Sequence, residues 1–221
     1  MVLDILTAAS INGIITPARG KSSLGLFDVL DVPAEVIEFA RATRRRYDAV
    51  MVGTNTVQVD NPMLTSHALP GQPCARVTLD PEGRIPRHYR IFDGSARTVV
   101  GVSSTTPRGY LEFLAARGVE AVCCGERRVD LPVFAAALAG RGLSKVLVEG
   151  GGRLSRALLD HDLVCAIHLV LLPIVLDSSA VNLFEGGPLG LGRLRLVRCD
   201  RVEDYLLLRY VVTRSGSWPV R

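Results

Sequence analysis

Short apolar runs rich in β-branched residues alternate with helical patterns of roughly ten residues along most of this 221-residue chain. The predicted strands are 48–53, 76–80, 97–103, 119–123 and 145–149, and the predicted helices are 33–47, 107–117, 131–139 and 152–160. Strands that alternate with helices in this way build a largely parallel sheet with helices on both faces. We therefore expect an α/β fold.

The C-terminal part has a different pattern. A long apolar strand is predicted at 163–172, and the strands 193–199 and 204–213 follow it with no room for a helix between them. Two strands joined this closely form an antiparallel hairpin, which we expect as an addition to the parallel sheet. The prediction is one domain over residues 1–213 and a loose tail at 214–221.

Charge and hydropathy narrow the range of partners. The 26 basic residues exceed the 22 acidic ones by a formal charge of +4, but aromatic residues are not interleaved with arginine as on nucleic-acid surfaces. The longest nearly apolar run, 163–176, is shorter than the roughly 20 residues of a membrane span. We expect neither nucleic acid nor a membrane as a partner.

Cysteine and histidine usage bears on metal and compartment. The five cysteines form no C-x-x-C pair, and the four histidines lie far apart. A zinc site is therefore not expected, and a thiol-reducing compartment fits better than a disulfide framework. Asp4 stands where a signal peptide would have a basic residue, so the expected location is cytoplasmic.

A strand that runs into three glycines is the most informative motif. The predicted strand ends at Glu149, and Gly150, Gly151 and Gly152 lead into a helix. Glycines allow close backbone approach, and the N–H groups at a helix start attract anions, so a phosphate or diphosphate is the expected ligand. The alternative is a tight turn without ligand. Glu149 lies at the ligand-binding edge of the sheet, unless it serves as a cap or surface salt bridge.

Polar residues also follow the predicted strand at 48–53. Gly53 precedes Thr54 and Thr56, and Asp60 stands just before Pro62, where a helix must stop. These side chains are candidates for ligand contacts. The alternative is structural, with Thr54 as a helix N-cap and a turn at 60–62. A third motif, 8–13, reads as a strand that ends in an Asn-Gly turn.

The three motifs occur together, in this order, in one family. The matching stretches are 10–13, 47–53 with Thr56, Asp60, Pro62, Leu64 and Thr65, 76–80 with Arg84 and Pro86, 118–120, and 148–152. On these residues the chain resembles the reductase domain of bacterial and archaeal riboflavin biosynthesis, from about residue 3 to residue 212. The resemblance implies a dihydrofolate-reductase-like fold with a mostly parallel central sheet.

The resemblance also implies an activity. Family members use NADPH to reduce a ribosylamino-pyrimidine 5′-phosphate to its ribitylamino form, with hydride delivered to C1′ of the sugar imine, and they are homodimers. A phosphorylated small molecule is thus the expected substrate. The implied cofactor residues are Ala8, Gly53, Thr54, Thr56, Asp60, Ser103, Gly150, Gly151, Gly152, Arg153 and Leu154. The implied substrate residues are Ser22, Arg44, Leu64, His67 and Glu149, and the candidate catalytic residues are Glu149 and Asp60.

There are also physical reasons to expect ligand contacts at Arg44 and Ser103. The Arg44 guanidinium suits a sugar phosphate because it binds phosphate bidentately, although it also reads as a solvated charge at a helix end. Ser103, Ser104 and Arg108 follow a predicted strand. They are candidates for the 2′-phosphate of NADPH, and a plain loop is the alternative.

The chain departs from the family pattern at several substrate positions. Family members usually have Asp-Gly-Lys or Asp-Gly-Arg where this chain has Asn12, Gly13 and Ile14, so a cation is lost there. The other departures are Leu24, His67 and Pro81. These differences leave two alternatives open: a reductase of the same fold that acts on another C=N compound, such as a pterin-like ring, and a nucleotide-binding protein without catalysis.

Overall fold

The computed structural model describes residues 1–65, 74–186 and 193–213. The chain forms two compact units, one of residues 41–150 with Met1 and one of residues 2–40 with 151–221. We call them unit one and unit two and describe each by itself. The prediction of a single domain over 1–213 stays a prediction, and the predicted tail 214–221 lies outside the described residues.

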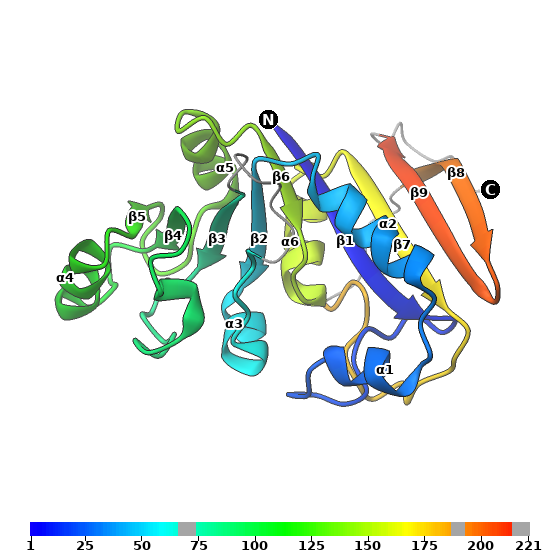
Figure 1. Cartoon of the computed structure of the whole chain (residues 1–221). Helices are drawn as coiled ribbons and strands as arrows, with labels where there is room; N and C mark the ends of the chain where they lie inside the picture. The colour runs from blue at the N-terminus through cyan, green and yellow to red at the C-terminus, as the bar shows by residue number, and fades with distance from the viewer. Residues whose placement is uncertain (66–73, 187–192, 214–221) are drawn as a thin grey trace. The chain divides into compact units, whose positions relative to one another are not determined.

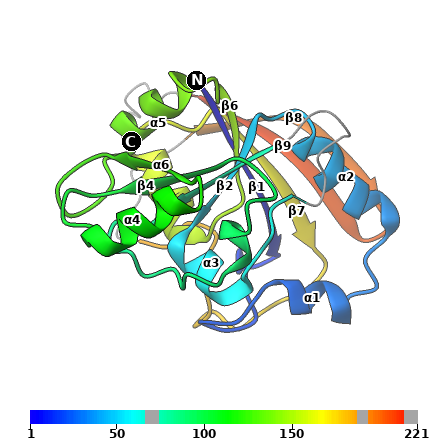
Figure 2. The ribbon, with the colours of Figure 1, turned by 60° about the vertical axis from the view of Figure 1, so that its left-hand side comes forward.

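Unit one contains a parallel sheet with the strand order β5-β4-β3-β2-β6 (Figure 1). Its strands are β2 (Ala49–Gly53), β3 (Ala75–Leu79), β4 (Thr98–Val102), β5 (Glu120–Cys123) and β6 (Lys145–Val148). Its helices are α3 (Thr54–Asp60), the 3-10 turn η1 (Arg90–Phe92), α4 (Arg108–Ala116) and α5 (Leu131–Ala139). Helix α3 continues directly from the carboxyl end of β2 (Figures 1 and 2).

Helices cover both faces of this sheet, as the alternation predicts. Val100 and Val102 of β4 share a buried cluster with Tyr110 and Leu114 of α4. Successive residues of a strand point to opposite faces, so Gly101 faces the other way. A Cβ at Gly101 would lie 3.1 Å from the Phe134 ring of α5, which shows how closely that helix approaches β4.

Unit two contains the strands β1 (Val2–Ser10), β7 (Ala166–Leu172), β9 (Tyr205–Thr213) and β8 (Arg193–Val202) in the order β1-β7-β9-β8. Strand β1 pairs with β7 in parallel, and β9 pairs antiparallel with β7 and with β8. Its helices are α1 (Leu24–Val29), α6 (Gly152–Asp160) and most of α2 (Ala34–Arg44), whose last turn belongs to unit one. Val36 and Phe39 of α2 pack against β7 and β9.

The expected class is confirmed: the strands are mostly parallel, helices flank them, and the chain has a C-terminal antiparallel hairpin. Asp130 caps α5 by accepting the Val133 N–H at 3.0 Å. The interpretation of Thr54 as an N-cap is wrong. Gly53 takes the cap position with extended backbone, so the helix begins at Thr54 and its hydroxyl donates to the Leu79 carbonyl. Among the described residues, no helix is long and apolar enough to cross a bilayer.

A fully buried arginine forms hydrogen bonds to several residues between β3 and β4 in unit one. Arg76 of β3 has no exposed surface, and its guanidinium donates to Thr98 Oγ1 at 2.9 Å, the Ala96 carbonyl at 3.0 Å and Asp93 Oδ1 at 2.8 Å. Burial alone would raise the pKa of Asp93. Hydrogen bonds from Ser95 and Arg76 outweigh burial and lower this pKa to about 2. The ion pair therefore persists well below neutral pH.

The Asp93→Asn variant is expected to be less stable than the wild type at neutral pH, because the amide keeps an acceptor for Arg76 but loses the charge. A carboxylate with a lowered native pKa contributes stability above its unfolded pKa, near 3.8, and that contribution is lost as pH falls through about 2. The difference in unfolding free energy, measured by denaturant titration, should therefore shrink between pH 4 and pH 2. A difference that stays constant over this range would contradict the assignment.

Candidate active site

The residues after β2 form the first part of the candidate site, in unit one. Gly53 is extended, with φ −79° and ψ 161°, and α3 starts from it. Thr54 is almost buried and its hydroxyl is occupied by Leu79, whereas Thr56 is half-buried. Thr54 is engaged within the fold, and Gln58 donates to the Arg84 carbonyl at 3.1 Å. Of the other polar side chains of α3, Asn55 is exposed, whereas Thr56 and Asp60 are half-buried and are the candidates for a ligand.

Asp60 carries an unsatisfied acceptor. Its Oδ1 is buried and accepts no hydrogen bond from the described residues. A buried polar atom left without a partner costs about 1–3 kcal/mol, so such atoms call for a ligand or water. A hydroxyl or amide donor of a nicotinamide dinucleotide would satisfy this oxygen. The residue thus fits the cofactor that the sequence predicts.

The loop after α3 holds Leu64 in an unusual conformation. Asn61 and Leu64 have φ of 41° and 56°, in the left-handed region that bulky side chains avoid. Arg90 fixes the start of this loop, because its N–H donates to Asn61 Oδ1 and its Nε donates to the Asn61 carbonyl, both at 2.8 Å. Backbone strain of this kind gathers at ligand sites, which agrees with the substrate role predicted for Leu64.

Arg44 and Glu149, predicted separately as substrate residues, form a bidentate ion pair. Nε and Nη2 of Arg44, in the last turn of α2, each donate to one oxygen of Glu149. The two side chains are 23% and 13% exposed, so Arg44 is not a solvated charge, and the salt bridge of Glu149 is largely buried. Burial alone would lower the pKa of Arg44, but its hydrogen bond and Coulombic attraction to Glu149 raise it.

The register of the sheet brings this pair to the edge that carries Gly53. Strand β6 pairs with β2 so that Met51 lies opposite Val148, and the Glu149 N–H donates to the Met51 carbonyl at 2.9 Å. Glu149 and Gly53 therefore follow the ends of neighbouring parallel strands. Cys74, which no sequence pattern indicated, lies within electrostatic range of Glu149 and Arg44. Burial raises the pKa of its thiol, and the negative charge of Glu149 raises it further.

Ser103 is buried, and its polar groups form hydrogen bonds within the fold. It is 2% exposed, its hydroxyl donates to the Pro81 carbonyl at 2.7 Å, and its N–H donates to Thr106 Oγ1 at 3.0 Å. Ser104 is exposed, and Arg108 pairs with Glu112 on the surface of α4. The assignment of Ser103 to the cofactor stays a prediction.

The helix that follows the glycines begins in unit two. Gly151 is the N-cap of α6, with φ −63° and ψ 167°. A Cβ on Gly152 would lie 2.0 Å from the Asn182 carbonyl oxygen and 2.9 Å from the Glu185 nitrogen. No other residue fits there, so Gly152 is required by contact with the chain's own backbone. Gly150 ends unit one, and its assignment to the cofactor stays a prediction.

The remaining predicted residues are placed as follows. Ala8 lies half-buried on β1, in register with Val170 of β7. Ser22 is half-buried just before α1, which starts at Leu24. Leu154 is 8% exposed on α6. His67 lies outside the described residues.

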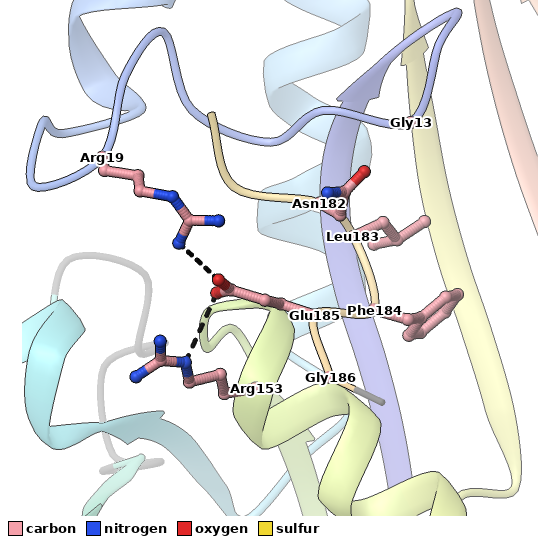
Figure 3. Close-up of a pocket in the computed structure, with 8 residues that line it drawn as sticks. All are labelled: Gly13, Arg19, Arg153, Asn182, Leu183, Phe184, Glu185 and Gly186. Carbon is pink, nitrogen blue, oxygen red and sulfur yellow. Dashed lines mark hydrogen bonds and ion pairs between the residues drawn. The ribbon is translucent and has the colours of Figure 1, made fainter. Parts of the chain in front are cut away.

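Arg153 lines a pocket of unit two that the sequence did not indicate. The pocket is formed by Gly13, Arg19, Arg153, Asn182, Leu183, Phe184, Glu185 and Gly186 (Figure 3). Ile14, at the position where the family has a cation, is only 1% exposed and carries no charge. No local pattern pointed to residues 182–186, because their role arises from contacts with distant parts of the chain.

Comparison with known proteins shows the family of the chain. A reductase for 2,5-diamino-6-ribosylamino-4(3H)-pyrimidinone 5′-phosphate from Methanothermobacter thermautotrophicus is 34% identical over 94% of this chain and 97% of its own. A pyrimidine reductase-like protein from Corynebacterium diphtheriae superposes with a TM-score of 0.79 at 21% identity, over 97% and 92% of the two chains. Dihydrofolate reductase from Enterococcus faecalis reaches 0.51 at 10% identity over 96% of each. The model of the RibD C-terminal domain matches residues 3–219, and the chain belongs to that family.

Proposed function

We propose that this protein is an NADPH-dependent reductase that converts a ribosylamino-pyrimidine 5′-phosphate to its ribitylamino form in riboflavin biosynthesis. The Methanothermobacter relative is named for reduction of such a compound. The observation in the structure that carries the proposal is the bidentate Arg44–Glu149 pair at the carboxyl edge of β6. It offers charged donors and acceptors together, as a phosphorylated and hydroxylated substrate requires.

The residues of the chain bind and orient the substrate and the cofactor, since hydride transfer needs neither a protein nucleophile nor a metal. When bound, the nicotinamide cofactor supplies the hydride for C1′ of the sugar imine. Asp60 accepts a hydrogen bond through its unsatisfied Oδ1, and the remaining N–H donors of Arg44 hold substrate oxygens. Glu149 keeps the Arg44 guanidinium in place and accepts from substrate hydroxyl or amino groups. Thr56 and Leu64 are the other proposed contacts in unit one, and Ala8 and Ser22 stay predicted contacts in unit two.

NADPH rather than NADH is part of the proposal. Ser104 is exposed at the end of β4, and its N–H and hydroxyl donate to the Gly125 and Glu126 carbonyls at 3.0 and 3.2 Å. The turn from Gly125 to Arg128 therefore lies beside this serine. Arg127 and Arg128 are both exposed there, and a guanidinium is the side chain that best complements a 2′-phosphate.

The purified protein should oxidise NADPH when it is given the pyrimidine ribosylamine phosphate. Absorbance at the reduced nicotinamide band measures turnover, and calorimetric titration compares the Kd of NADPH with that of NADH. NADPH binding without turnover on this substrate would instead support a reductase of another C=N compound, which the uncharged, buried Ile14 favours. Absence of NADPH binding would overturn the proposed function.

Glu149→Gln should lower kcat/KM about 10- to 100-fold, because one charge-assisted hydrogen bond to the substrate and the ion pair to Arg44 are lost. The Kd of NADPH should stay within about twofold of the wild type, since Glu149 is assigned to the substrate side of the site. Steady-state kinetics and cofactor titration separate the two effects.

The matched control is Glu120→Gln. Glu120 also pairs with an arginine of unit one, Arg97, but both side chains are about 40% exposed. This variant should keep wild-type kinetics. A similar loss of activity in both variants, or a weakened NADPH affinity in Glu149→Gln, would show that Glu149 has a different role.

We further propose that the protein is a homodimer whose interface includes β8. This strand is the last in the order of unit two, and its apolar side chains Leu194, Leu196 and Val197 are 44%, 48% and 40% exposed. The strand also carries arginines, but an edge strand that exposes apolar side chains can pair with a second chain unless something covers it. A second copy of the chain is the partner that the resemblance to the family predicts.

Sedimentation equilibrium should give about twice the chain mass of 23.9 kDa. Leu196→Lys should shift the equilibrium towards the monomer, because a buried interface would then contain an unpaired charge. Val29→Lys, at another exposed apolar position of unit two, serves as the control and should leave the mass unchanged. A wild-type monomer at micromolar concentration would exclude this interface.

A further inference from the structure

The turn from Asn61 to Leu64 in unit one has a backbone conformation that its own residues disfavour. Asn61 has φ 41° and ψ 53°, although it stands directly before Pro62. The residue before a proline favours extended backbone, because the proline ring crowds the helical conformations. Leu64 has φ 56°, which a bulky side chain avoids. Such a conformation persists only where contacts from elsewhere in the fold hold it.

Arg90, which lies 29 residues further along the chain, supplies two of these contacts. Its backbone N–H donates to Asn61 Oδ1, and its guanidinium Nε donates to the Asn61 carbonyl, both at 2.8 Å. The direction of a carbonyl follows from ψ of its own residue, because the peptide unit is planar and rotates as a whole. The bond from Nε therefore holds ψ of Asn61 at its unusual value.

The backbone of Arg90 is itself held firmly. Arg90 begins the 3-10 turn η1, whose other two residues, Ile91 and Phe92, are buried. The buried Arg76 donates Nη1 to the Arg90 carbonyl at 3.2 Å and to the Met63 carbonyl at 3.4 Å. Arg76 therefore joins Arg90 to the turn that Arg90 holds.

The last turn of α3 has separate support. Gln58 donates Nε2 to the Arg84 carbonyl at 3.1 Å, and the Tyr89 hydroxyl donates to the Gln58 carbonyl at 3.2 Å. These bonds fix the end of the helix, which carries Asp60. Loss of the Arg90 side chain should therefore leave Asp60 in place and release the residues that follow it.

We infer that Arg90 is a positioning residue for the substrate: its guanidinium holds Asn61 in the left-handed conformation, and this conformation sets the place of Leu64. The inference rests on the proposed function for the identity of the substrate and for the role of Leu64. In the structure Leu64 packs against the buried cluster that contains Val57 and Ile91. With Asn61 extended, the chain would leave α3 in another direction, and Leu64 would move away from this cluster.

Arg90→Ala tests the inference. The turn should then hold its binding-competent conformation for a smaller fraction of the time, and the apparent affinity for substrate falls by that fraction. We expect KM for the pyrimidine ribosylamine phosphate to rise about 10-fold, as for loss of one charge-assisted hydrogen bond. The value of kcat at saturating substrate and the Kd of NADPH should both stay within about twofold of the wild type.

The matched control is Arg87→Ala. Arg87 is exposed, belongs to the same connection between β3 and β4, and donates Nη2 to a backbone carbonyl at 3.1 Å, but this carbonyl is that of Gly109 in α4. The variant should keep the wild-type KM. An equal rise of KM in both variants, or an unchanged KM in Arg90→Ala, would overturn the inference. A fall in kcat with unchanged KM would also overturn it, because that result indicates a loss of folded enzyme.

A second substitution tests whether Arg90 acts through the strain at Asn61. Replacing Pro62 by alanine removes the bias of Asn61 towards extended backbone. The double variant Arg90→Ala/Pro62→Ala should therefore have a lower KM than Arg90→Ala alone. A double variant with no recovery would show that Arg90 does not hold this strained residue, and would overturn the inference.

Amide hydrogen exchange separates this inference from the proposed function, because it needs no substrate. The peptide of residues 54–65 contains the Asn61 N–H, which donates to the Val57 carbonyl at 2.9 Å. This peptide should exchange faster in Arg90→Ala than in the wild type and in Arg87→Ala, since the turn opens more often. Equal exchange in all three proteins would overturn the inference. A wild type without turnover but with this exchange pattern would overturn the proposed substrate and support the role of Arg90 in holding the turn.

Discussion

The candidate residues of unit one lie close together because β2 and β6 pair in parallel. Parallel strands end at the same edge, so the polar residues after Gly53 and the carboxylate after Val148 meet there, although about ninety residues separate them in sequence. The Met51 carbonyl accepts the Glu149 N–H and carries the pairing one residue beyond the strand. An antiparallel β6 would place Glu149 at the opposite edge, away from Asp60.

The Arg44–Glu149 pair shows why charged residues are retained where burial makes them costly. Removing both groups from water carries a penalty of several kcal/mol, which bidentate geometry offsets only while both partners are present. The guanidinium has five N–H donors and the carboxylate uses two of them. The remaining N–H donors of Arg44 lie in a partly buried environment of lower dielectric constant. A contact with a phosphate or hydroxyl is stronger there than in bulk water.

Local patterns predicted the fold well, because periodicity, caps and turn residues act over a few positions. The helices at 131–139 and 152–160 are examples. The site was predicted less completely. Arg44 and Glu149 were identified, but a contact 105 residues apart leaves no trace in either local pattern. Thr54 was misjudged because its hydroxyl partner, Leu79, comes from another strand. The left-handed Leu64 lies in a loop whose start, Asn61, is held by the distant Arg90.

The third glycine is required by a contact within the fold. A run of glycines before a helix predicts close approach of a phosphate, yet at Gly152 the close approach is made by the Asn182 carbonyl. That same contact fixes residues 182–186 beside the start of α6, and the bridge between Ile14 and Asn182 joins the turn after β1 to them. An apolar residue at position 14 therefore does more than remove a cation. Its buried side chain helps to position the segments that line the pocket with Arg19 and Arg153.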